Sequence, residues 1–151
     1  MRVVEDDLTD PRVLDLLALH ARGMLDTSPP ESAHFLDVSG LQASDVTFWT
    51  AWDDDALAGC GALKELDPRH GELKSFRTHP DHLRRGVADL LVSTALDAAR
   101  ARRYAQVSLE TGTGPAFEAA HRLYERHGFV ETGPFADYVL DPFSRFMVLE
   151  L

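Results

Sequence analysis

The stretch from Gly71 to Ala101, GELKSFRTHPDHLRRGVADLLVSTALDAARA, constrains the fold more than any other part of the sequence. Its first residues, Glu72 to Thr78, favour a β-strand, and His79-Pro80-Asp81 ends that strand. The chain then bends through Gly86 into a helix. One face of this helix is mostly apolar and holds Val87, Leu90, Leu91, Thr94, Ala95 and Ala98. A strand, a turn and an amphipathic helix in succession require a sheet against which the helix packs.

The turn before this helix can bind an anion. The first amide groups of a helix have no acceptor within the helix and lie at the positive end of its dipole. Gly86 and Ala88 carry almost no side chain, so a phosphate can approach the main chain, and Arg84 and Arg85 add positive charge. The nucleotide-binding patterns GxxxxGK[ST] and GxGxxG are absent. These residues alone leave open a plain strand-to-helix connection with solvated arginines.

Two segments together resemble the GNAT N-acetyltransferases, which use acetyl-CoA. The first, Leu83-x-x-Gly86-x-Ala88, is similar to that family's [Q/R]-x-x-G-x-[G/A] turn, except that leucine replaces glutamine or arginine. The second, from Ala120 to Phe129, resembles the A-x-x-L-Y-x-x-x-G-F pattern at the end of a later helix. The two motifs occur in the expected order and at the expected distance. Such a pair is far more specific than either motif alone.

The resemblance implies an α/β fold, the GNAT acyl-CoA N-acyltransferase fold, with a mixed twisted sheet and helices on both faces. Its two central parallel strands are expected at Glu72 to Thr78 and Gln106 to Glu110, splayed so that the pantetheine arm pairs with main-chain groups. Contacts to that arm are expected from Phe76, Arg77 and Thr78, and the pyrophosphate is expected at Arg84, Arg85, Gly86, Val87, Ala88 and Asp89. Phe117, which stands where the family often has asparagine, and Ala120 complete the expected cofactor site.

The resemblance also suggests two catalytic residues. Tyr124 matches the family tyrosine near the cofactor sulfur, where a phenol can protonate the departing thiolate. Glu72 matches a strand glutamate that serves some relatives as a general base through water. A buried helix-face aromatic and an exposed glutamate at a strand start are the structural alternatives for these two residues.

The other elements follow from local patterns. Met1 to Glu5 suits a short edge strand, and Asp10-Pro11 begins a helix that runs to about Leu25 with His20 on its apolar stripe. Ser32 is expected to cap a second helix. The remaining strands are expected at 46–52 and 56–66, which form a hairpin around three aspartates, and at 129–132, 135–138 and 146–151.

The acceptor is expected to be the primary amine of a small molecule, attacked directly in a ternary complex. In the GNAT architecture a helix-loop-helix lines the acceptor pocket. The residues assigned to acceptor binding are therefore Ser28, Glu31, His34, Phe135 and Tyr138. The net charge of -10 favours a cationic amine. A protein or peptide N-acetyltransferase, or a CoA-binding module without turnover, remains open.

Composition limits the other function classes. A chain of 151 residues, 44% of them hydrophobic, suits a single domain over 1–151. The negative net charge argues against nucleic acid as a partner, and His79 and His82 lack the further ligands that a metal site needs. Cys60 is the only cysteine, and no signal peptide or long apolar span is apparent, so no membrane association and a cytoplasmic location are expected. A homodimer is left open.

Overall fold

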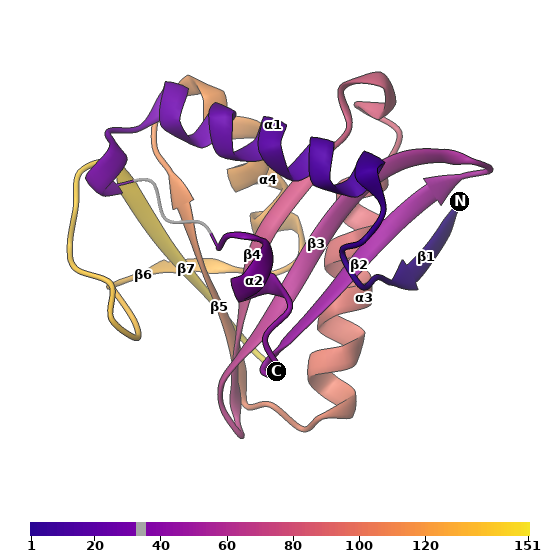
Figure 1. Cartoon of the computed structure of the whole chain (residues 1–151). Coiled ribbons are helices and arrows are strands. Elements are labelled where there is room, and N and C mark those ends of the chain that lie inside the picture. The colour runs from indigo at the N-terminus through magenta and orange to yellow at the C-terminus, as the bar shows by residue number, and fades with distance from the viewer. Residues whose placement is uncertain (33–35) are drawn as a thin grey trace.

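The computed structural model describes residues 1–32 and 36–151. One seven-stranded sheet forms its centre, in the order β1-β2-β3-β4-β5-β7-β6. Its strands are β1 (Arg2–Glu5), β2 (Val46–Asp53), β3 (Ala56–Asp67), β4 (His70–Thr78), β5 (Gln106–Gly112), β6 (Val130–Thr132) and β7 (Ser144–Glu150). All neighbouring pairs are antiparallel except β4 and β5, which are parallel. The mixed sheet that the sequence led us to expect is therefore confirmed (Figure 1).

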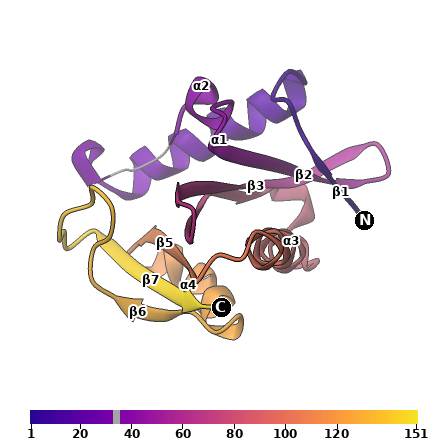
Figure 2. The ribbon, with the colours of Figure 1, turned by 90° about the horizontal axis from the view of Figure 1, so that it is seen from below.

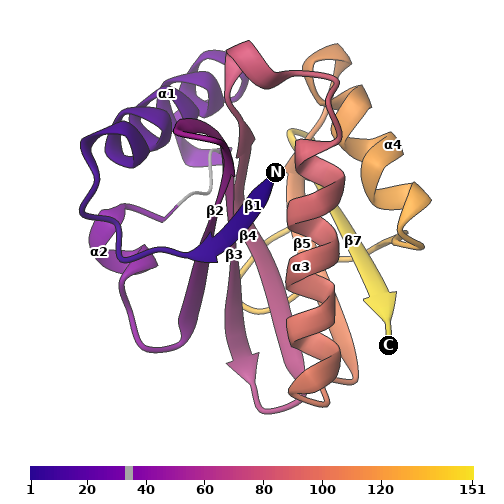
Figure 3. The same cartoon turned by 90° about the vertical axis from the view of Figure 1, so that its right-hand side faces the viewer.

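Helices cover both faces of this sheet. Helices α1 (Pro11–Thr27) and α2 (Val38–Leu41) lie on one side, and α3 (Val87–Ala101) and α4 (Glu118–Arg126) lie on the other (Figure 2, Figure 3). Three short 3-10 helices, η1 (Pro30–Ser32), η2 (Pro80–His82) and η3 (Pro115–Phe117), lie in the connections. This layering divides the apolar core into two clusters, one on each face of the sheet.

Helix α1 begins where its sequence predicts. The Asp10 carboxylate accepts a hydrogen bond of 2.9 Å from the Arg12 amide, and Pro11 occupies the first turn, where no amide donor is needed. The helix then buries Val13, Leu16 and Leu17 against the sheet. Its apolar stripe, rather than intrinsic helix propensity, therefore holds α1 in place.

A bulge bends β4 in its middle. Lys74 pairs with Ala62 of β3 and Arg77 pairs with Cys60, so that Ser75 and Phe76 together lie opposite Gly61. The φ angle of Ser75 is +60°, a left-handed conformation that a serine adopts only under tertiary constraint. The Phe76 ring covers Gly61 so closely that a Cβ on this glycine would lie 2.6 Å from Phe76 Cε1.

The bulge accompanies a separation of β4 from β5. The parallel pairing runs from His70 opposite Gln106 to Leu73 opposite Leu109 and ends there. Beyond that point β4 stays paired with β3 as far as Thr78, while β5 stays paired with β7 as far as Gly112. The two strands thus open toward their carboxyl ends, as the resemblance implied.

The phase of α3 differs from the sequence prediction. Val87, Leu91 and Ala95 are buried as expected, but Leu90 is 36% exposed. The remaining buried positions are Val92, Leu96 and Ala99, which extend the stripe to its other side. Because α3 packs against β2, β3 and β4, its buried stripe is rotated away from Leu90.

Two further predictions of secondary structure were wrong. In the described residues, no helix runs from Ser32 through Leu36: Ser32 lies in η1, residues 36 and 37 are not helical, and α2 begins at Val38, where the Asp37 carboxylate accepts from the Gly40 amide. Residues 135–138 do not form a strand. They form a turn closed by a hydrogen bond from the Tyr138 amide to the Phe135 carbonyl, because the Tyr138 side chain is bound to β4.

Replacing Gly61 by alanine tests the close packing that accompanies the bulge. The new methyl group overlaps the Phe76 ring, so we expect Gly61→Ala to lower the free energy of unfolding by about 1–3 kcal/mol, measured by urea denaturation. Gly133→Ala is the matched control, since a Cβ at that position meets no atom within 4 Å. Equal stability of the two variants would contradict the overlap.

His20 lies on the sheet-facing side of α1 and is largely buried. Burial, followed by the nearby positive charge of Arg77, lowers the pKa of His20 to about 4 from the usual 6.5. Its Nδ1 atom is buried and has no hydrogen-bond partner in the described part of the chain. At neutral pH this imidazole is therefore uncharged.

This lowered pKa makes stability depend on pH. The unfolded chain binds a proton at His20 near pH 6.5, whereas the folded chain does so only near pH 4, so stability is lost as the pH falls between these values. We expect the loss from this group to reach at most about 3 kcal/mol at pH 4. His20→Leu should flatten the unfolding free energy over this range, measured by urea denaturation at each pH. An unchanged pH dependence in the variant would contradict this assignment.

Candidate active site

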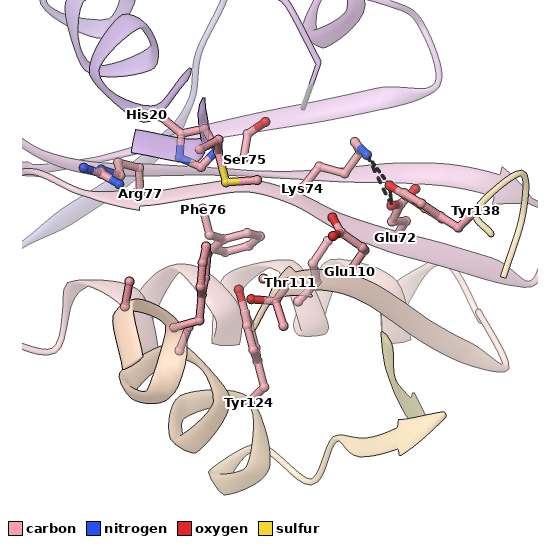
Figure 4. Close-up of a pocket in the computed structure, with 16 residues that line it drawn as sticks. His20, Glu72, Lys74, Ser75, Phe76, Arg77, Glu110, Thr111, Tyr124 and Tyr138 are labelled. Carbon is pink, nitrogen blue, oxygen red and sulfur yellow. Dashed lines mark hydrogen bonds and ion pairs between the residues drawn. The ribbon is translucent and has the colours of Figure 1, made fainter. Parts of the chain in front are cut away.

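A cavity of about 210 Å³ lies where β4 and β5 separate. Both sheet faces contribute to its walls, because α1 supplies His20 and Met24 while α4 supplies Ala120 and Tyr124 (Figure 4). The other lining residues are Glu72, Leu73, Lys74, Ser75, Phe76 and Arg77 of β4, Glu110, Thr111 and Gly112 of β5, Ala116 and Phe117 of η3, and Tyr138. The opening of the sheet therefore connects the helical layers on its two sides.

Glu72 is the most deeply buried acid in this cavity, with 3% of its surface exposed. Its Oε2 accepts a hydrogen bond of 2.6 Å from the Tyr138 hydroxyl and another of 3.2 Å from Lys74 Nζ (Figure 4). Lys74 Nζ also donates to the Tyr138 hydroxyl oxygen at 2.8 Å. The structure thus places Glu72 in a buried three-residue cluster and rules out the exposed strand-start alternative.

The sequence reasoning missed Lys74. Residues two apart on a strand point to the same face, so the spacing of Glu72 and Lys74 was a signal that could have identified it. The Glu72–Lys74 ion pair is nearly inaccessible, with side chains 4% and 9% exposed. A carboxylate this deeply buried needs such a partner to stay charged.

Tyr138 comes from the connection between β6 and β7. Its ring packs against Phe135 and Phe146, with centroids 5.0 Å and 5.6 Å away. Burial, followed by the charge and hydrogen bond of Glu72, raises the pKa of the Tyr138 phenol well above its usual value. This phenol is therefore a firm hydrogen-bond donor to Glu72 at neutral pH.

Tyr124 lines the opposite wall of the cavity. Its ring packs edge-on against Phe129 at a centroid distance of 5.8 Å, which fixes its direction. Burial raises the pKa of the Tyr124 phenol to about 12, and the charge of Glu110 adds to this rise. Glu110, another cavity residue that sequence reasoning did not single out, thereby helps keep Tyr124 protonated and able to donate a proton.

The start of α3 has the form of an anion site. Arg84 and Gly86 both have left-handed backbone conformations, with φ of +62° and +79°. The Leu90 amide donates to the Gly86 carbonyl at 3.0 Å, so the amides of residues 87–89 come before the first amide that has an acceptor within the helix. A Cβ at Gly86 would meet no atom within 4 Å, which leaves space for a group bound at the helix end.

The charged side chains at this site have separate contacts. The Asp89 carboxylate is 3.0 Å from His127 Nε2 and 3.4 Å from Arg126, both near the end of α4. Only its main-chain amide is therefore suited to a phosphate. Arg85 is 58% exposed and lies 3.6 Å from Asp53, so it can reorient toward an anion at little cost.

The other residues expected to contact the cofactor have differing positions. Phe76 and Arg77 line the cavity, whereas Thr78 ends β4 opposite Gly59. The Phe117 ring lies directly against Gly112, since a Cβ on this glycine would be only 2.3 Å from the ring. Ala120 lines the cavity. The main-chain groups of β4 that are not paired with β5, the small residues and the start of α3 together fit an extended ligand that carries phosphate groups.

Of the residues expected to bind the acceptor, Tyr138 alone lines the cavity within the described part of the chain. Ser28 caps the end of α1, Glu31 is exposed in η1, and Phe135 packs behind Tyr138. His34 lies outside the described residues. A hydrogen bond from Ser32 to the Asp141 carboxylate joins η1 to the β6–β7 connection, so these two segments do meet.

A second hollow, a groove of about 650 Å³, adjoins the cavity. Glu72, Lys74 and Tyr138 line both spaces and therefore form the partition between them. The rest of the groove consists of Asp45, Lys64, Glu65, Leu66, Asp67, His70, Ala136, Asp137 and Val139. Carboxylates outnumber cationic side chains in this lining.

The structure also bears on the other expectations from the sequence. Cys60 is buried, and burial raises the pKa of its thiol to about 12, so it is a structural residue. Among residues 1–32 and 36–151, no cluster of three or more potential metal ligands occurs. No helix within these ranges is both long and apolar enough to span a membrane.

Similarity to known proteins agrees with this geometry. A family model described as the acetyltransferase (GNAT) family matches residues 13–129. The chain is 56% identical to an uncharacterized N-acetyltransferase of Escherichia coli, YedL, over 97% of this chain and 92% of that protein. It is 50% identical to the uncharacterized N-acetyltransferase YsnE of Bacillus subtilis, over the whole of both chains.

A solved structure agrees in fold. The crystal structure of a Bacillus subtilis acetyltransferase in complex with CoA superposes with a TM-score of 0.73, over 99% of this chain and 98% of that chain. The two sequences are 19% identical, so this likeness supports the fold alone. The family match and the two relatives establish that the chain belongs to the GNAT family of acetyltransferases and is an acyltransferase.

Proposed function

We propose that the protein transfers an acetyl group from acetyl-CoA to the primary amine of a small molecule, by direct attack in a ternary complex. One observation carries this proposal: a buried carboxylate, Glu72, and a protonated phenol, Tyr124, line the same cavity at the opening between β4 and β5. Acetyl transfer to an amine requires a group that accepts a proton and a group that donates one.

In the proposed reaction Glu72 acts on the amine and Tyr124 on the thiol. Glu72 takes a proton from the ammonium form of the acceptor, directly or through water, and the neutral nitrogen attacks the thioester carbonyl. The carbon–nitrogen bond forms as the carbon–sulfur bond breaks, and Tyr124 protonates the departing thiolate. The second proton of the attacking nitrogen leaves as the amide forms and passes through water to the Tyr124 phenolate. Because its pKa is about 12, Tyr124 holds this proton throughout the neutral range.

Acetyl-CoA supplies the thioester and is held by this chain's main-chain groups. The α3 amides, together with Arg84 and Arg85, would hold the pyrophosphate, because they combine dipole and positive charge beside the open space at Gly86. Main-chain groups of Phe76, Arg77 and Thr78 would hold the pantetheine arm along the unpaired edge of β4. Phe117 and Ala120 would line the other side.

The acidic groove beside the partition is the proposed approach for the acceptor. Asp45, Glu65 and Asp67 line it, and their charge favours a cationic amine. Tyr138 lies at the inner end, and we propose that Ser28, Glu31 and Phe135, which do not line the cavity, help to position the acceptor. We propose the same role for His34, which is outside the described residues. Acetylation assays with a panel of diamines, amino acids and peptides distinguish this function from peptide acetylation. Inactivity with every amine of the panel would indicate a CoA-binding module without turnover.

Tyr124→Phe tests the proposed acid. The change keeps the ring against Phe129 but removes the proton donor, so we expect kcat to fall by about a hundredfold or more with little change in the acceptor KM. Thiol release from acetyl-CoA, measured with the best amine of the panel, gives both constants. Tyr104→Phe is the matched control, because Tyr104 is a buried tyrosine that bonds Glu65 and does not line the cavity. Equal turnover in both variants would remove Tyr124 from the mechanism.

Gly86→Asp tests the proposed phosphate site. It places a negative side chain in the open space at the α3 end and imposes a left-handed conformation on a residue with a Cβ. We expect the Kd for CoA, measured by calorimetry, to rise by at least about tenfold. Gly133→Asp carries the same charge change at an exposed position with free space. Undiminished affinity in a folded Gly86→Asp protein would place the pyrophosphate elsewhere.

Several expectations from the sequence stay predictions: one domain over 1–151, a cytoplasmic location, and partners that include neither nucleic acid nor membrane. The homodimer likewise stays open.

A further inference from the structure

The chain contains only two lysines, Lys64 and Lys74, among 15 lysine and arginine residues. Arginine can replace lysine where a positive charge alone is needed, but the guanidinium is not a nucleophile at neutral pH. One of the two primary amines on side chains thus lies in the candidate active site. Lys64, on β3, lines the adjoining groove but not the cavity.

Lys74 Nζ occupies surroundings like those that an acceptor amine requires. It lines the same cavity as Tyr124, and it is bonded to Glu72 Oε2 at 3.2 Å and to the Tyr138 hydroxyl at 2.8 Å. An amine that passes its proton directly to Glu72 makes a contact of this kind. The side chain is 9% exposed, so bulk water competes little with these contacts.

We propose that Lys74 is itself an acceptor, and that the protein acetylates its own Lys74 Nζ when acetyl-CoA is bound and the groove holds no amine substrate. The proposal rests on the proposed function, since it uses Glu72 and Tyr124 in the same roles. A side chain held in the cavity needs no separate binding step, so its effective concentration is high.

The chemistry is balanced with acetyl-CoA as the only co-reactant. Lys74 Nζ gives one proton to Glu72, and its lone pair attacks the thioester carbonyl carbon. The new carbon–nitrogen bond becomes an amide as the carbon–sulfur bond breaks, and Tyr124 protonates the thiolate to give free CoA. The second proton lost by the nitrogen passes through water to the Tyr124 phenolate, and Glu72 releases its proton to solvent. The amide does not return its acetyl group, so the product is a modified enzyme rather than an intermediate.

Modification would change the partition between cavity and groove. Acetylated Lys74 carries no charge, so the buried ion pair with Glu72 is lost, while the Tyr138 hydroxyl can still donate to that carboxylate. The added acetyl group also occupies space in a cavity of about 210 Å³. We therefore expect a saturating amine substrate to protect Lys74, and prior acetylation to slow later turnover.

Deuterium-labelled acetyl-CoA tests the proposal without knowledge of the natural acceptor. The full-length protein is incubated with it, and tandem mass spectrometry of peptides follows the label at Lys64, at Lys74 and at the chain's amino terminus. We expect Lys74 to be labelled at least about tenfold faster than Lys64, although it is buried. Uncatalysed acylation gives the opposite order, because it follows exposure and amine basicity.

Two variants separate catalysis from chemical background. Glu72→Gln should reduce labelling at Lys74 at least about a hundredfold, while Lys64 is labelled as in the unchanged protein. Lys64→Arg leaves Lys74 as the only lysine and should retain its labelling. Calorimetry with CoA and urea denaturation identify a Glu72→Gln protein that is folded and still binds cofactor.

The outcomes distinguish this inference from the function on which it rests. Acetylation of amines in the panel with no label at Lys74 would overturn self-acetylation alone. Labelling at Lys74 that is unaffected by Glu72→Gln in a folded, CoA-binding protein would also overturn it, because the reaction would then be chemical. Absence of both activities would overturn the proposed function as well.

Discussion

The separation of β4 from β5 is the constraint on which the rest of the site depends. The strands pair through Leu73 and Leu109 and then follow their outer neighbours, β3 and β7, in diverging directions. The bulge at Ser75 and Phe76 coincides with this point, and Gly61 has no side chain that would block the Phe76 ring. Without the divergence, side chains from α1 and α4 could not line one cavity through the sheet.

Burial of charge organises the inner end of that cavity. A lone carboxylate with 3% exposure would favour its neutral form, but Glu72 has a cation and a phenol as close partners. The same contacts fasten the β6–β7 connection to the sheet through Tyr138. One set of interactions therefore both positions Glu72, the candidate base, and holds the β6–β7 connection against the sheet.

Two tyrosines in one cavity, Tyr124 and Tyr138, have different surroundings. Burial raises the pKa of both, but the Tyr138 hydroxyl is bonded to Glu72, whereas the Tyr124 phenol is influenced by the charge of Glu110. The α3 end provides the complementary feature, a concentration of amide donors beside two arginines. The buried acidic cluster and the amide-rich start of α3 therefore lie at separate places in the structure.

Local patterns in the sequence determined much of this protein. The Asp10-Pro11 start of α1, the β2–β3 hairpin, the succession of β4, turn and α3, and the two GNAT motifs each depend on neighbouring residues, so they could be read without the fold. They pointed to Glu72 and Tyr124, which line one cavity in the structure, and to Gly86, which lies at the start of α3. The two motifs also identified the family, because the residues of each motif lie close together in the sequence.

Only the tertiary structure determined which of these side chains are in contact. Tyr138 lies 66 positions from Glu72 and 64 from Lys74, and no local pattern encodes a contact between such distant residues. Residues 135–138, which the sequence predicts as a strand, form a turn in which Tyr138 makes this contact. Packing of α3 against β2, β3 and β4 determines which of its faces is buried, and Leu90 lies outside that face. Periodicity gives the spacing of a buried stripe, but its orientation depends on which surface it meets in the folded chain.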